Sequence, residues 1–132
     1  MANEGSNNVS KLRASDGTVL GTFAAGMEPS DVAFDGANIW VANQGSNSVT
    51  KLQGSDGKVL GTFSVGTQPT LVAFDGADIW VTNTHSNNVT KLRASDGTTP
   101  GTFSVGNSPR GIIFDGANIL VVNELSNTVS KL

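Results

Sequence analysis

The stretch PSDVAFDGANIWVANQGSNSVTKL, residues 29–52, decides the fold because the chain repeats it. It returns as PTLVAFDGADIWVTNTHSNNVTKL over residues 69–92 and as PRGIIFDGANILVVNELSNTVSKL over residues 109–132. The copies begin forty residues apart, and they align without a gap. Self-similarity at a fixed period of this length indicates a repeat architecture in which each unit forms one supersecondary motif.

The repeat extends over the whole chain. Residues 1–132 are expected to form a single unit with repeats at 13–52, 53–92 and 93–132. Residues 1–12, MANEGSNNVSKL, resemble residues 121–132, VVNELSNTVSKL, and therefore form a duplicated partial repeat.

Each repeat is predicted to hold four short strands joined by tight turns, at residues 31–34, 39–42, 48–52 and 59–65 in the best-defined copy. Asp35-Gly36 is a strong hairpin signal between the first two strands. The run Ile-Trp-Val-Ala in the second strand is apolar at successive positions, which is typical of a strand covered on both faces. Pro100 falls in the fourth strand of the last complete repeat, and proline is tolerated mainly at sheet edges, so that strand is expected to be the outer one.

Four antiparallel strands in about forty residues favour a β-propeller blade over a β-solenoid coil. The pattern PxxVAFDGANIWVANxGSNxVTKLxxSDGxVLGTFxVG also resembles the YVTN and NHL-type propeller repeats, with IWVAN and IWVTN at their second-strand signature. This resemblance covers essentially the whole chain and implies an all-β propeller fragment. The near uniformity of the copies is similar to that of designed or recently amplified propellers. Such repeats serve enzymes, cell-surface proteins and binding scaffolds alike, so the resemblance singles out no activity.

Three blades are too few to close a ring, and an open wedge would leave apolar blade faces in water. The expected solution is homo-oligomerisation, in which identical wedges meet head to tail until the ring closes. Bulky Phe34, Phe74 and Phe114 in the inner strand favour three copies and nine blades, with two copies and six blades as the alternative. Residues 18–25 of one copy would supply the fourth strand of the last blade of another. Residues 9–12 and 129–132 would then compete for one strand position.

Composition excludes several classes of partner. A net charge of −3 gives no reason to expect nucleic acid or an anionic membrane. The chain has no cysteine, so thiolate metal sites are excluded, and no apolar run approaches the length that spans a bilayer. The sequence predicts a soluble chain without a signal peptide and leaves its compartment open.

The repeated aspartates and tryptophans have two interpretations. Asp35, Asp75 and Asp115 could line a channel with carboxylates, but turn formation by Asp-Gly is favoured. Trp40 and Trp80 could form a sugar-binding platform, but packing between blades is favoured because apolar residues flank both.

No catalytic set is expected. His85 is the only histidine and is interpreted as a solvated loop residue. The fold also resembles that of streptogramin lyases, which use histidine and glutamate near the channel. The matching positions here are Asp31, Leu71 and Gly111, so that activity is not expected, and neither a cofactor nor a metal is expected.

The function favoured by the sequence is a self-assembling scaffold without catalytic activity. The alternative is a binding module that presents loops at the channel mouth, where sequence varies between the copies. The candidate residues for such a ligand surface flank the three repeated prolines: Glu28, Asp31, Gln68, Leu71, Ser108 and Arg110.

Overall fold

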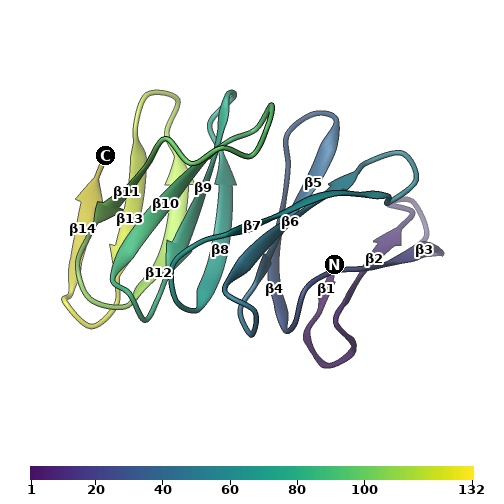
Figure 1. Cartoon of the computed structure of the whole chain (residues 1–132), viewed down its shortest axis with the longest axis horizontal. Helices are drawn as coiled ribbons and strands as arrows, with labels where there is room; N and C mark the ends of the chain where they lie inside the picture. The colour runs from purple at the N-terminus through teal and green to yellow at the C-terminus, as the bar shows by residue number, and fades with distance from the viewer.

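The computed structural model describes all of residues 1–132, and apart from one short 3-10 helix they form strands joined by turns. Four small antiparallel sheets follow one another along the long axis of the molecule, with the two termini in the sheets at opposite ends (Figure 1). No helix has the length and apolar character needed to cross a membrane. The predicted all-β class and antiparallel repeat are confirmed.

The strands of each sheet pair in chain order, so the fourth strand of each complete sheet is an outer edge, as predicted. Sheet I holds β1 (Ala2–Asn3), β2 (Asn8–Leu12) and β3 (Val19–Ala24), with the helix η1 (Glu4–Ser6) between the first two. Sheet II holds β4 (Pro29–Phe34), β5 (Asn38–Asn43), β6 (Ser48–Gln53) and β7 (Val59–Ser64). Sheet III holds β8 (Pro69–Phe74), β9 (Asp78–Asn83), β10 (Asn88–Arg93) and β11 (Gly101–Ser104). Sheet IV holds β12 (Pro109–Phe114), β13 (Ile119–Asn123) and β14 (Thr128–Lys131).

The inner strands begin earlier than predicted. β4 starts at Pro29 rather than at Asp31, because a register shift between these residues lets Pro29 pair with Asn43. The same irregularity recurs in sheets III and IV. A β-bulge of this kind bends a strand without ending it, and a bulge is not readable from an alternation pattern.

Pro100 shortens the outer strand of sheet III. β11 begins at Gly101, whereas β7 of sheet II begins at Val59, the counterpart of Thr99. Proline has no N–H to donate, and an outer edge strand tolerates this loss. The predicted edge position is confirmed.

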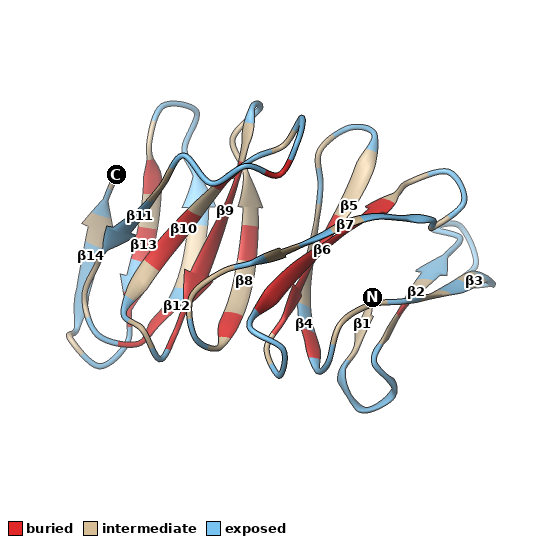
Figure 2. Ribbon diagram, in the orientation of Figure 1, coloured by how far each residue is buried: buried red, intermediate tan, exposed pale blue.

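The best-packed core lies between sheets II and III. Trp40, Ala42 and Val49 of sheet II are fully buried there against sheet III, whose contribution is Val72, Ile79, Val81 and Leu92. Figure 2 shows the buried stretches concentrated in the middle sheets, while the two end sheets carry mostly exposed or half-buried residues. The hydrophobic core is thus made of contacts between sheets. This agrees with the prediction that the second strand of each repeat, which is apolar at successive positions, is covered on both faces.

Candidate assembly faces and loop site

The residues that precede the repeated prolines are held against the preceding sheet. Glu28, Gln68 and Ser108 have positive φ values of 51°, 57° and 55°. Their backbone N–H groups donate to the Oδ1 atoms of asparagines 21 residues earlier, at distances of 2.9, 2.8 and 2.9 Å, from Asn7, Asn47 and Asn87. These three predicted site residues are therefore positioned by bonds between sheets.

Asp31 has a structural partner. Its Oδ2 accepts a hydrogen bond from the Val72 N–H at 2.9 Å, which joins the inner strands β4 and β8. Leu71, at the matching position in sheet III, cannot make such a bond and is half-buried. Arg110 is exposed and pairs with Glu124, with Nε and Oε2 3.0 Å apart.

A polar hollow of about 470 Å³ lies where sheets III and IV meet. Of the predicted ligand-surface residues, Ser108 and Arg110 line it, whereas Glu28, Asp31, Gln68 and Leu71 do not. The exposed His85 lies at its wall, in the loop where it was predicted. The full lining is Thr84, His85, Asn87, Asn107, Ser108, Arg110, Glu124 and Leu125.

The aspartates of the Asp-Gly turns organise the hairpins between the first and second strands. Asp35 Oδ1 accepts from the N–H groups of Ala37 and Asn38 at 2.9 and 2.6 Å, and its Oδ2 accepts from the Trp40 indole at 2.7 Å. Asp75 repeats this pattern in sheet III. The favoured interpretation as turn residues is confirmed.

These bonds favour the charged carboxylate. Partial burial opposes ionisation of Asp35, but the bonds from the Trp40 indole and the Asn38 and Ala37 amides outweigh it and lower its pKa below the ordinary 3.8. The pKa of Asp75 is lowered in the same way, with burial again opposed by its indole and amide bonds. A group whose pKa is depressed by folding stabilises the protein above its unfolded pKa, and this contribution is lost as the pH falls through the folded pKa.

We therefore expect the free energy of unfolding to decrease as the pH is lowered below about 4. The double variant Asp35→Asn, Asp75→Asn should weaken this dependence because it removes two of the carboxylates whose pKa is lowered by folding. Urea unfolding between pH 2 and 6 measures the effect, with Glu4→Gln, an exposed carboxylate, as the control. An unchanged pH dependence in the double variant would contradict the assignment.

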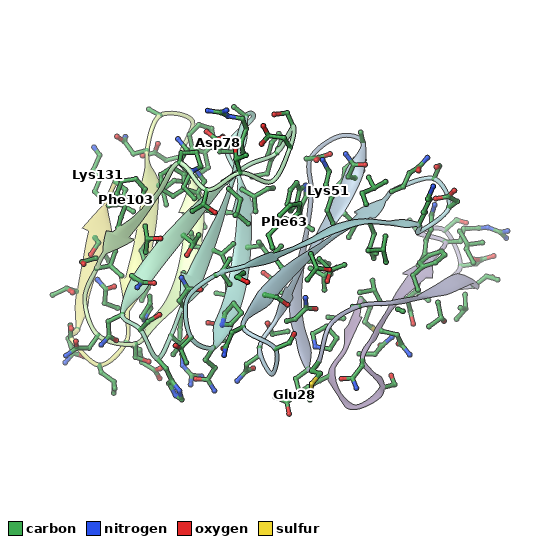
Figure 3. The ribbon with its side chains drawn as sticks, viewed as in Figure 1. Glu28, Lys51, Phe63, Asp78, Phe103 and Lys131 are labelled. Atoms are coloured by element: carbon green, nitrogen blue, oxygen red, sulfur yellow. The ribbon has the colours of Figure 1, made fainter.

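The tryptophans pack between sheets. The Trp40 ring stacks on Phe63 of the outer strand β7, with centroids 5.7 Å apart, and the Lys51 Nζ lies 4.9 Å from its centroid. Trp80 has the equivalent contacts with Phe103 and Lys91 in sheet III. Figure 3 labels Lys51 and Phe63, the neighbours of Trp40. Trp40 is fully buried and Trp80 is 7% exposed, so neither ring offers an open face to a sugar. The favoured packing interpretation is confirmed.

The free face of sheet IV exposes positions that are buried elsewhere. Val122 and Val129 are 50% and 62% exposed, whereas Ala42 and Val49, their counterparts in sheet II, are fully buried by sheet III. Ile113 is exposed on the same face, and the half-buried Leu120 pairs with it directly across the two strands. We call Ile113, Leu120, Val122 and Val129 the C-terminal face.

The opposite end of the molecule has a matching recess. Leu12 of β2 is 40% exposed, although its counterpart Leu52 is 1% exposed. Between sheets I and II lies an apolar hollow of about 230 Å³, whose walls include Leu12, Phe23 and Val32. We call this hollow and Leu12 the N-terminal recess.

Polar bonds between sheets also repeat along the chain. The Lys11 Nζ donates to the Gly54 carbonyl at 3.1 Å, and the Lys51 Nζ donates to the Ala94 carbonyl at 2.7 Å, in each case to a residue 43 positions on. In sheet IV, Lys131 is the copy of the donors Lys11 and Lys51. Asn127 is the copy of Asn7, Asn47 and Asn87, whose side chains accept from the residue before each repeated proline. The side chains of Asn127 and Lys131 make no hydrogen bond within the chain. Lys131 lies at the C-terminal end of the molecule (Figure 3).

These features define a β-rich repeat protein. The C-terminal face at one end and the N-terminal recess at the other correspond to the two sides of the contact between sheets II and III. No family model matches the sequence, and no curated protein does. Among solved structures the chain is similar to hydrazine synthase of Kuenenia stuttgartiensis, with a TM-score of 0.84 and 18% identity over 99% of this chain and 45% of that one. It is also similar to a functionally unknown protein from Desulfotomaculum acetoxidans DSM 771, with a TM-score of 0.73 and 19% identity over 95% of this chain and 47% of that one. The chain spans less than half the length of either, and at these identities the likeness concerns the fold alone.

Proposed function

We propose that the protein is a self-assembling β-propeller scaffold of the YVTN/NHL repeat type, without catalytic activity, whose copies join head to tail into a closed ring. The observation that carries the proposal is the repetition of one interface. The C-terminal face presents the positions through which sheet II packs on sheet III, and the N-terminal recess presents the positions that receive them. One face that fits the other end of an identical molecule produces a head-to-tail contact, which forms a ring when its rotation closes.

The apolar surface provides the driving force. Full burial of a valine or isoleucine side chain contributes roughly 1.5–3 kcal/mol. Ile113, Val122 and Val129 together would therefore supply several kcal/mol per contact, before the entropic cost of association is subtracted. The unpaired Asn127 and Lys131 would add polar bonds of the kind that already join sheets within the chain.

Three copies per ring are favoured over two. Phe34, Phe74 and Phe114 occupy the last position of each inner strand, and Phe74 packs against the core between sheets II and III. Bulky side chains near the axis separate neighbouring sheets there and so favour the wider ring of nine blades. The ring of two copies and six blades remains the alternative.

Native mass spectrometry tests the proposal. We expect a species of three times the chain mass of 13.5 kDa, with twice that mass as the alternative ring. A 13.5 kDa monomer that persists at micromolar concentration would overturn self-assembly. A ladder of masses without an upper limit would show open chains instead of a ring.

The polar hollow supports a second candidate function, ligand binding by the loops. It contains Arg110 and His85, whose side chains differ from those at the matching positions of the other repeats, and Glu124, which pairs with Arg110. Loops on a rigid scaffold commonly carry recognition. Saturable binding of a small polar molecule to the assembled protein, lost in Arg110→Ala, would favour this candidate.

A further inference from the structure

We propose that the copies join by strand exchange, in which sheet IV of one copy displaces residues 1–12 of the next and its β14 takes the place of β2 on β3. This inference rests on the proposed self-assembly and specifies how the second copy is received. Four observations support it. They are the lining of the N-terminal recess, the position of Leu120, the residues that occur at both termini, and the strand pairs that each possible exchange would break.

The N-terminal recess is the empty counterpart of the tryptophan site. The neighbours of Trp40 come from β6, β7 and sheet III. Each neighbour has a counterpart forty residues earlier in the chain, and these counterparts lie in sheets I and II. Val49, Lys51, Phe63, Val72, Ile79 and Leu92 thus correspond to Val9, Lys11, Phe23, Val32, Ile39 and Leu52. All six of the latter line the hollow. Met1 also lines the hollow, and a volume of about 230 Å³ stays open beside these side chains.

Leu120 of a second copy is the side chain that fits this site. Its position in the repeat is that of Trp40 and Trp80. Ile119 and Val121, its neighbours in β13, are buried against sheet III, so Leu120 lies on the opposite, open face with Val122 and Val129. The apolar Leu120 side chain would enter an apolar hollow of about 230 Å³ whose walls are the counterparts of those around Trp40.

The exchange preserves the contacts that residues 7–12 make with sheet II. Asn127 replaces Asn7 at the Glu28 N–H, and Lys131 replaces Lys11 at the Gly54 carbonyl. In the same alignment of residues 127–132 with residues 7–12, Val129 replaces Val9 and Leu132 replaces Leu12. β14 would therefore bond to β3 in the register that β2 uses now.

The strand pairs indicate which copy is displaced. β1 forms the pairs Ala2–Val9 and Asn3–Asn8 with β2. Met1 and Ser10 also exchange two hydrogen bonds, and the Asn3 amide donates to Asn8 and Ser10. Displacing residues 1–12 breaks these contacts and the five pairs between β2 and β3, which β14 would form again in the same register. The opposite exchange, which keeps β2 and displaces β14, breaks the four pairs between β13 and β14, which β2 would form again, and it also expels β1. The opposite exchange thus releases two separate segments, whereas the proposed exchange releases only residues 1–12, and we take the N-terminal copy as the one that leaves.

Cysteine cross-linking tests the exchange, because the natural chain has no cysteine. Ala24 is paired with Asn8 within the chain, and the exchange would pair it with Thr128 of another copy. Residues directly opposite in an antiparallel pair have Cα atoms about 4.5–5.5 Å apart, within the range for a disulfide. The two variants are Ala24→Cys with Thr128→Cys, and the matched control Ala24→Cys with Asn8→Cys, both oxidised after assembly.

We expect the Ala24, Thr128 variant to form covalently linked copies, and the Ala24, Asn8 variant to cross-link at least tenfold less within one chain. If the assembled protein cross-links instead through residues 24 and 8, the exchange is wrong while self-assembly stands. If both variants are monomers, the proposed function itself fails. Deletion of residues 1–10 gives a second measurement: an oligomer with the same number of copies supports the exchange, and a monomer overturns it.

Discussion

Replacing Val129 by lysine is expected to yield a folded monomer. Val129 is 62% exposed in the single chain, so the charge costs little before association. Its counterpart Val49 is fully buried between sheets, and the proposed contact would bury position 129 in the same way. Burying an ammonium group without a partner costs several kcal/mol, so association should weaken at least about hundredfold. Sedimentation velocity over a concentration series measures this change, and circular dichroism checks the fold.

The matched control is Val59→Lys. Val59 is 49% exposed on the outer strand β7, and its counterpart Val19 is likewise exposed, so neither position belongs to an interface between sheets. This variant should assemble like the natural protein. Equal dissociation of both variants would point to a nonspecific effect of added charge, and assembly by both would show that the C-terminal face is not the contact.

The fold could be predicted because every local signal occurs several times in the chain. Asp35-Gly36 and its copies mark the hairpins, and the Ile-Trp-Val run marks a strand covered on both faces. The structure places Asp35 and Trp40 in the predicted roles and adds that they bond to each other. Asp35 and Trp40 were interpreted separately from the sequence, although the Trp40 indole donates a hydrogen bond to the Asp35 carboxylate. Pro100 identified the outer edge because proline is one of the few residues whose backbone chemistry restricts its place in a sheet.

The ligand surface was harder to predict because its residues depend on contacts between sheets. Asp31 bonds to Val72, 41 positions away, and the loop before Pro29 is held by Asn7. No alternation or turn pattern encodes a bond between two sheets. One signal was available: the asparagine at positions 7, 47, 87 and 127 recurs in every copy. All four have positive φ, and the side chains of the first three bond to the backbone that enters the next sheet. The polar hollow was not predicted because its lining residues come from sheets III and IV, and the sequence does not show how two sheets meet.

Trp40→Ala is expected to cost about 3–5 kcal/mol of unfolding free energy, the usual range for truncating a fully buried tryptophan. The loss has three physical sources. A cavity opens between sheets II and III, the stacking on Phe63 disappears, and Asp35 loses its indole donor. Since a domain of this size is stable by only about 5–15 kcal/mol, the variant should lie close to unfolding at room temperature.

The measurement should be made by urea unfolding in the Val129→Lys background, because association would otherwise add a concentration-dependent term to the stability. The control is Leu60→Ala on the outer strand, where the side chain is 47% exposed and the expected cost is below about 1 kcal/mol. Trp40→Leu should cost less than Trp40→Ala, because leucine already occupies this position of the repeat at Leu120. If Trp40→Ala costs no more than the control, the core does not depend on the contacts between sheets. The faces proposed for assembly would then lack the interface from which they were inferred.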